Sequence, residues 1–248
     1  MEELEHSLFL VELFNKIFGE PLAALLALVG IEVHNPEHLF PDYMVMSIFA
    51  ALFLILFLGL SSRRLRIVPS KRQGILELII EYFENLLVDI IGEQGKKYLP
   101  MIATIGLFIL FCNLLGLVPG FMSPTSKLNV TAGCALVVFV YYNWQGIKSQ
   151  GLFRYLKHFT GPIPLLAPLL LPIEIISHFS RPVSLSIRLF GNIFAEELLI
   201  LVIASIIPFF LPLPFMAVAI FTALIQAFVF VLLSCIYIAG AVAHEEER

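Results

Sequence analysis

Long runs of mostly apolar residues restrict what this chain can fold into more than any other feature. A helix needs roughly 17–25 such residues to cross the hydrocarbon of a bilayer. Of the whole sequence 59% is hydrophobic and only 14% is charged, whereas a soluble domain carries about 25% charged residues. We therefore predict an all-α integral membrane protein, a single membrane domain over 1–248 with a non-cytoplasmic segment over 1–40. The five predicted transmembrane helices cover 41–60, 98–119, 130–147, 166–207 and 213–243.

The segment over 73–95 differs from these runs. Its apolar residues recur close to the 3.6-residue period, and Glu77, Glu81 and Glu84 share the opposite face. Three carboxylates make it a poor span, so we predict an amphipathic helix at the membrane interface.

Basic residues gather in two loops, around 61–72 and 148–158. Five spans put both loops on one side of the membrane, and the positive-inside rule makes that side the cytoplasm. The loops over 119–129 and 208–214 contain Lys127 and no arginine, which agrees with this orientation. We therefore expect a multi-pass protein whose N-terminus is outside and whose C-terminus is cytoplasmic.

The span over 166–207 carries nearly all of the charge expected inside the membrane. Each charged group at the bilayer centre costs about 2.5–3.5 kcal/mol on insertion scales. His178 and Arg181 lie near the proline-rich stretch 161–172, which we expect not to begin as a regular helix, so an interfacial position is an alternative reading for both. That alternative fits Arg188 poorly, since it lies near the middle of the span. The charged and titratable residues are Glu174, His178, Arg181, Arg188, Glu196 and Glu197.

Helical geometry arranges these residues. At about 100° per residue, one narrow arc holds Glu174, Ser177, Arg181, Arg188 and Asn192. His178 and Glu196 border this arc, which we call the polar strip, and Glu197 falls nearly opposite Arg188. Because no other span offers a nearby acid, we expect the partner of Arg188 to lie on another chain.

Three sequence blocks resemble one known family. The first has the pattern S-x-x-x-R-L-F-G-N-x-x-A-x-E and runs from Ser184 through Arg188 to Glu197. The second is Ala-Leu-Ile-Gln-Ala-Phe over 223–228, followed by Tyr237, and the third covers 124–131. Together with the order of the apolar runs, they make the chain similar, over nearly its whole length, to subunit a of F-type ATP synthases, the proton-channel stator subunit of the Fo sector.

The resemblance implies an architecture and a function. The last two long helices would lie tilted, as a hairpin, against a ring of c subunits that each carry one carboxylate. Two aqueous half-channels would load and unload protons on those carboxylates and so couple proton flow to ring rotation and ATP synthesis. The implied partners are the c-ring proteolipids, b-type peripheral stalk subunits, membrane lipid and the transported protons, in a bacterial inner (plasma) membrane. The chain itself would perform no catalytic chemistry.

Within that family the residue matched by Arg188 stands between the half-channels. A carboxylate that faces lipid is neutral because desolvation raises its pKa, whereas beside a cation it ionises. Arginine does not release its own proton at ordinary pH, so it attracts the carboxylate and blocks a direct leak. Lysine would be a poor substitute because burial can remove its charge.

The remaining site residues are also implied by position in the family pattern. Glu197 matches the acid of the non-cytoplasmic half-channel, and its neighbour Glu196 could share that role. Some members pair this acid with a histidine, where this chain has Ala219. The sequence does not decide between the two glutamates.

Four further polar residues of the last two spans match the family pattern, whereas His178 receives no role from it. Glu174 and Ser177 match positions near the cytoplasmic half-channel, and Asn192 and Gln226 match polar neighbours of the arginine.

Two other function classes compete with this interpretation. An independent channel or secondary transporter would need a site built by this chain alone, which the unpaired Arg188 argues against. An intramembrane hydrolase is suggested only by the H-x-x-E-H pattern over 34–38, where Pro36 interrupts the helix that a metal site needs. We expect no metal and no cofactor, and the net charge of −4 argues against nucleic-acid binding. The sequence leaves three properties open: whether protons or sodium ions are coupled, the number of c subunits in the ring, and whether the complex synthesises or hydrolyses ATP.

Overall fold

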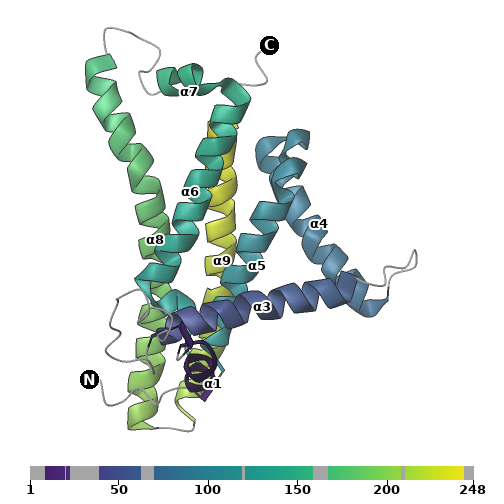
Figure 1. Cartoon of the computed structure of the whole chain (residues 1–248), viewed down its shortest axis with the longest axis vertical. Coiled ribbons are helices and arrows are strands. Elements are labelled where there is room, and N and C mark those ends of the chain that lie inside the picture. The colour runs from purple at the N-terminus through teal and green to yellow at the C-terminus, as the bar shows by residue number, and fades with distance from the viewer. Residues whose placement is uncertain are drawn as a thin grey trace.

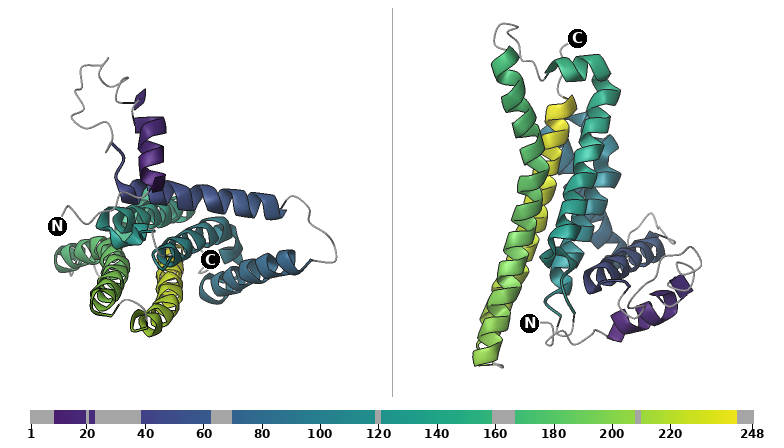
Figure 2. Two further views of the ribbon diagram at one scale, coloured as in Figure 1. Left: turned by 90° about the horizontal axis from the view of Figure 1, so that it is seen from below. Right: turned by 60° about the vertical axis from the view of Figure 1, so that its left-hand side comes forward.

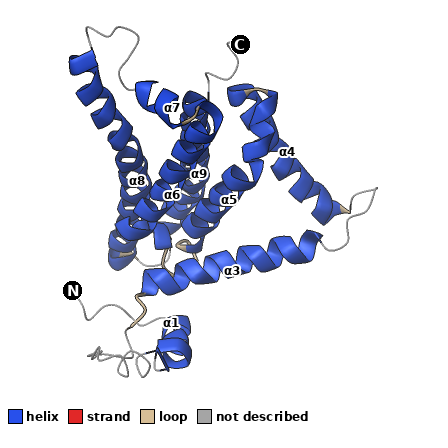
Figure 3. Cartoon of the chain, turned by 45° about the horizontal axis from the view of Figure 1, so that its top comes forward, coloured by secondary structure: helices blue, strands red, loops and turns tan. Residues whose placement is uncertain are grey.

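The computed structural model describes residues 9–19, 21–22, 39–62, 70–118, 121–158, 167–207 and 210–242. Within these ranges the chain forms helices and short connections and no strand (Figure 3). The H-x-x-E-H pattern and Arg63, Arg64 and Arg66 lie outside the described residues.

Five of the described helices are long and apolar enough to cross a membrane, which confirms the predicted fold class. The amphipathic helix α4 (Lys71–Ile91) is not among them. The candidate spans belong to α3 (Asp42–Ser62), α5 (Leu99–Leu115), α6 (Leu128–Gln150), α8 (Ala167–Ile206) and α9 (Pro212–Val242).

The amphipathic segment forms α4 (Lys71–Ile91). Ser70 caps its start by accepting a hydrogen bond from the Gln73 amide at 3.5 Å. The helix ends at Gly92, whose φ of 90° suits a residue without a side chain. A 3₁₀ helix, η4 (Glu93–Tyr98), then turns the chain into α5.

Shorter helices complete the fold. They are α1 (Phe9–Phe14), the π-helix η2 (Asn15–Gly19), the 3₁₀ turn η5 (Pro124–Ser126) and α7 (Leu152–His158). Gly151, with a φ of 79°, separates α6 from α7. Because α7 packs back on α6, it covers one end of the bundle, beside the start of α8 (Figure 1).

The beginning of the proline-rich stretch, 161–166, lies outside the described residues, so the expectation that it is not a regular helix stays a prediction. Helix α8 starts at Ala167 and continues through Pro172 and Pro182. Pro168 occupies the first turn, where a backbone N–H would have no partner within the helix. Pro182 lies on the packed part of α8, between the buried residues His178 and Leu185, where packing offsets the hydrogen bond that the proline removes.

The directions of the helices follow from their lengths. In Figures 1 and 2, α3 runs across the bundle, whereas α8 and α9 lie side by side along the longest axis. The 37-residue apolar part of α8 is about 55 Å long, and hydrocarbon is about 30 Å thick. A straight helix of this length stays within the hydrocarbon only when it tilts by roughly 55° from the membrane normal. The 21 residues of α3 match this thickness when that helix stands upright.

One apolar core joins α4, α5, α6, α8 and α9. Leu87, Ile102, Ile109, Leu189 and Phe230 are completely buried in it. Helix α6 packs against both α8 and α9, and α5 packs against α9. The core fixes the inner face of α8, because His178, Leu185, Ser186, Leu189 and Ile193 are buried there. The rest of α8 is largely uncovered by this chain.

Candidate functional site

The polar strip of α8 lies along the seam between α8 and α9. Asn192 Nδ2 donates a hydrogen bond to Gln226 Oε1 on α9 at 2.6 Å. The guanidinium carbon of Arg181 lies 5.4 Å from the ring centre of Tyr237, also on α9. Arg188 belongs to the same helical arc and falls between these two links, so it lies beside α9 as well.

Arg188 is exposed, and among the described residues it makes no ion pair or hydrogen bond. The two ion pairs in the described part of the chain join Lys96 to Glu84 and Glu93, at 3.2 and 2.9 Å. They lie at the end of α4, away from the strip. Arg188 therefore keeps its charge available to a group outside this chain.

Glu197 points away from the strip, as the helical phase predicted. Its Oε1 accepts a hydrogen bond from the Ser123 amide at 3.0 Å, in the loop between α5 and α6. Gly116 lies against the same group, since a Cβ there would be 2.8 Å from Glu197 Oε1. A glycine at 116 therefore lets the carboxylate approach the end of α5.

Both glutamates line one cavity of about 290 Å³, between the end of α5, the following loop and α8. One carboxylate oxygen of Glu196, Oε2, is buried and has no hydrogen-bond partner among the described residues. A polar, roomy site of this kind can hold water molecules that satisfy such an atom. The cavity can therefore bring water to two carboxylates at once.

A chain of buried hydroxyl and amide groups continues from this cavity. The sequence predicted that Asn113 would hydrogen-bond to a neighbouring helix, but not the hydroxyl groups that lead to it. Ser123 Oγ lies 2.7 Å from Thr125 Oγ1, which donates to Asn113 Oδ1 at 2.7 Å. Asn113 Nδ2 in turn donates to the Ala223 carbonyl on α9 at 3.3 Å. The Ser-Pro-Thr-Ser run over 123–126 was the available signal, because small polar residues beside an apolar span seldom lack a partner.

The other end of the strip is more closely packed. Glu174 is partly exposed and Ser177 is exposed. His178 is buried, and its Nε2 lies 2.9 Å from Asn143 Oδ1 on α6. Asn143 Oδ1 also accepts a hydrogen bond from the Tyr155 hydroxyl. Sequence patterns gave no reason to single out Asn143 or Tyr155.

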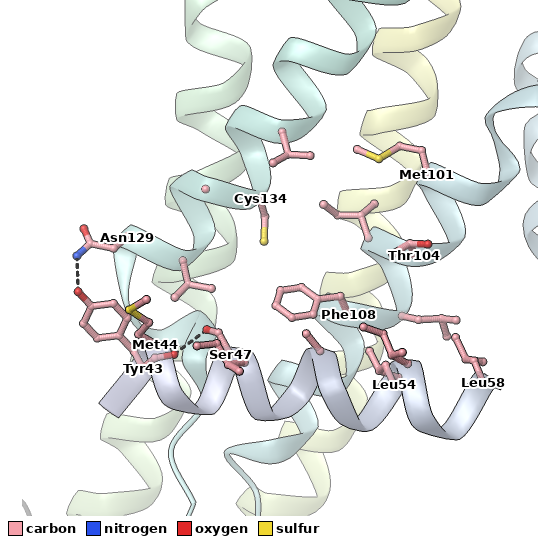
Figure 4. A pocket seen from close by; sticks show the side chains of 18 residues that line it. Tyr43, Met44, Ser47, Leu54, Leu58, Met101, Thr104, Phe108, Asn129 and Cys134 are labelled. Carbon is pink, nitrogen blue, oxygen red and sulfur yellow. Dashed lines mark hydrogen bonds between the residues drawn. The ribbon is translucent and has the colours of Figure 1, made fainter. Parts of the chain in front are cut away.

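A larger cavity, of about 640 Å³, lies between α3, α5 and α6 (Figure 4). Its lining is mostly apolar, and at one end Asn129 Nδ2 donates to the Tyr43 hydroxyl at 3.2 Å. None of the predicted site residues lines it. Within the described residues, no group of three or more His, Cys, Asp or Glu side chains could hold a metal ion.

Comparison with known proteins agrees with this geometry. Residues 44–239 match the family model of the ATP synthase A chain. A protein of a Nitratiruptor species, named ATP synthase subunit a, is 44% identical over 219 residues, which are 88% of this chain and 96% of that protein. The protein of the same name from Campylobacter fetus is 45% identical over 84% of this chain and 92% of its own length. ATP synthase subunit a 1 of Pelobacter propionicus is 47% identical over 77% and 82% of the two chains.

Proposed function

We propose, from the premise that this chain belongs to the ATP synthase A chain family, that it is the stator of the Fo proton translocator. In this role it provides two aqueous half-channels that load and unload protons on the carboxylates of a c-ring. Proton flow through both half-channels then turns the ring and drives ATP synthesis. The b-type subunits of the peripheral stalk hold the stator still.

The exposed, unpaired Arg188 is the observation that carries this proposal. A guanidinium inside a membrane without a counter-charge costs at least about 2.5–3.5 kcal/mol. Among the described residues no acid meets it, and it borders the large uncovered face of α8. A ring of carboxylates passing that face supplies the missing charge.

Arg188 then acts as a fixed charge and not as a proton carrier. Each ring carboxylate that reaches it ionises and must already have given up its proton to one half-channel. The carboxylate takes up a new proton from the other half-channel before it returns to lipid. Because arginine does not release a proton, the two half-channels exchange protons only through rotation of the ring.

The half-channel residues follow from the two ends of the strip. Glu197 and Glu196, with the cavity they share, serve the half-channel on the side of the N-terminus. Glu174 and Ser177 serve the half-channel at the end where α7 lies. Asn192 and Gln226, joined by a 2.6 Å hydrogen bond, hold α8 and α9 together beside Arg188.

The charge distribution favours one orientation in the bacterial inner membrane. Lys148 and Arg154 lie at the α7 end, and the positive-inside rule makes that end cytoplasmic. The N-terminus is then outside and the C-terminus cytoplasmic. The driving force is about 2.3 kcal/mol per proton for each 100 mV.

Replacing Arg188 by alanine in the complete ATP synthase tests the proposal. We expect ATP-driven proton pumping in inverted vesicles to be abolished while the complex still assembles. Arg154→Ala is the matched control, since this exposed arginine lies on α7, outside the five candidate spans, and should pump normally. Normal pumping by the Arg188→Ala complex would refute the proposed function, as would failure of the chain to co-purify with a ring-forming proteolipid.

A further inference from the structure

A buried hydrogen-bond cluster connects α6, α7 and α8, and the proposed function makes no use of it. Its centre is Asn143 on α6, whose Oδ1 lies 2.9 Å from His178 Nε2. The hydroxyl of Tyr155 on α7 donates to the same oxygen at 2.7 Å. Asn143 Nδ2 donates to the Phe139 carbonyl at 2.7 Å, which settles which end of the amide faces the cluster.

These bonds determine how the imidazole can exchange a proton. Since the amide oxygen only accepts hydrogen bonds, His178 Nε2 must carry a hydrogen in both charge states of the ring. The proton that the ring gains or loses is therefore the one on Nδ1. Two neighbouring rings of α6 restrain the imidazole, because the centroids of Phe139 and Tyr142 lie 5.0 and 5.5 Å from its own.

The charged residues next to this ring along α8 are Arg181, three positions after His178, and Glu174. Arg181 reaches toward α9, where its guanidinium lies over the Tyr237 ring. Glu174 precedes His178 by four residues, the spacing at which two side chains of a helix are neighbours. The other titratable groups packed here are the hydroxyls of Tyr142 and Tyr155. Glu174 is thus the acid placed to exchange a proton with the imidazole.

On the basis of the proposed function, the geometry points to His178 as the proton-exchange group of the half-channel at the α7 end, with Asn143 as its positioning residue. In one direction the imidazole takes a proton from a hydronium ion, which leaves a water molecule, and then gives it to the Glu174 carboxylate. One N–H bond breaks, one O–H bond forms, and the ring returns to its neutral form. The reverse sequence releases a proton to water. Imidazole suits this task because its ordinary pKa is the one nearest to neutral pH among side chains.

His178→Gln separates proton exchange from structure, because an amide N–H can still donate to Asn143 Oδ1 but cannot carry a proton in transit. In inverted vesicles stripped of the catalytic sector, we expect its passive proton conductance to fall at least about tenfold at neutral pH, since a positioned acid–base group contributes 10²–10⁴-fold. The dependence of conductance on pH between about 5.5 and 8.5 should flatten, because no imidazole then titrates in that range. The amount of assembled complex should not change.

Asn143→Leu should also lower conductance, because it leaves His178 without its anchor. Asn129→Leu is the matched control on the same helix. The Asn129 amide makes an exposed hydrogen bond with the Tyr43 hydroxyl of α3, so the conductance of this variant complex should equal that of the unmodified complex. Unchanged conductance and pH dependence in His178→Gln, beside a loss in Arg188→Ala, would overturn the inference and leave the proposed function standing. Normal pumping in Arg188→Ala would overturn both.

Discussion

The two polar regions that flank Arg188 along α8 differ in kind. At one end Glu196 and Glu197 line a cavity of about 290 Å³, and the hydrogen bond to Glu197 comes from a backbone amide. At the other end His178 is packed among aromatic rings and bonded to a side chain, Asn143. Water can reach a carboxylate through a cavity, whereas a proton that crosses a packed cluster must pass through a side chain of that cluster. The first region should therefore depend on charge and space, and the second on exact hydrogen-bond partners.

Each region also contains a glycine where a side chain has no room. A Cβ on Gly116 would lie 2.6 Å from Ser123 Cβ, and one on Gly146 would lie 2.5 Å from Tyr155 Cε2. Both distances are too short for real Cβ contacts, so the two glycines allow the same substitution to test both regions.

The largest expected effect comes from removing both carboxylates of the cavity. Glu196→Gln combined with Glu197→Gln keeps the shape of the site but removes both groups that we propose take up protons, so conductance through Fo should fall about 10²-fold or more. Each single variant should lose less, because the two side chains share one cavity. Passive proton uptake by stripped vesicles measures this, and normal uptake by the double variant would end the idea that the glutamates act together.

Gly116→Ala should give the next largest effect. The new methyl group must displace Ser123 or Glu197, which breaks their hydrogen bond, and overpacking of this kind costs about 1–3 kcal/mol. Both the thermal stability of the extracted complex and its proton conductance should decrease. Gly133→Ala on α6 is the control, because a Cβ there meets nothing within 4 Å. Equal behaviour of the two variants would show that the cavity does not depend on this close approach.

Gly146→Ala should have a smaller effect on conductance. Its methyl group would press on Tyr155 and lie 3.2 Å from the Ala241 carbonyl, so α7 must shift, at a cost of about 1 kcal/mol, the low end for overpacking. The Tyr155 hydroxyl should lose Asn143, while the bond between His178 and Asn143 survives. Conductance that fell further than in Gly116→Ala would reverse the comparison between the two regions.

The smallest effect is expected from the hydrogen bond between Asn192 and Gln226 beside Arg188, and it should appear as a change in the stability of the complex. A double-mutant cycle of Asn192→Leu and Gln226→Leu should give a coupling energy of about 0.5–1.5 kcal/mol, the usual net value of one hydrogen bond. Thermal dissociation of the extracted complex provides the free energies. A coupling near zero would mean that the 2.6 Å contact does not hold α8 against α9.

The sequence could predict the features that depend on one helix at a time. Run lengths predicted five spans, and the 3.6-residue period put Asn192 and Arg181 on one arc and Glu197 on the opposite side. The contacts of Asn192 and Arg181 with α9, and of Glu197 with Ser123, agree with that phase.

Contacts between residues that are far apart in the sequence could not be predicted from helical periodicity. Ser123 reaches Glu197 from an irregular loop, whose path is determined by tertiary packing and not by periodicity. In the sequence Asn143 looks like a polar residue at the membrane interface. Only the return of α7 over α6 brings the Tyr155 hydroxyl to it.

The length of α8 has a mechanical consequence. His178 and Glu197 are 19 positions apart in the sequence, which is about 28 Å along a helix axis. With the tilt of roughly 55° that a helix of this length requires, about 16 Å of that distance is depth and about 23 Å is lateral displacement. A charge carrier that enters beside one end and leaves beside the other must therefore travel sideways, along the membrane plane. Under the proposed function, a voltage that acts only across the membrane would in this way exert a tangential force on the neighbouring ring, and a tangential force on a ring produces a torque.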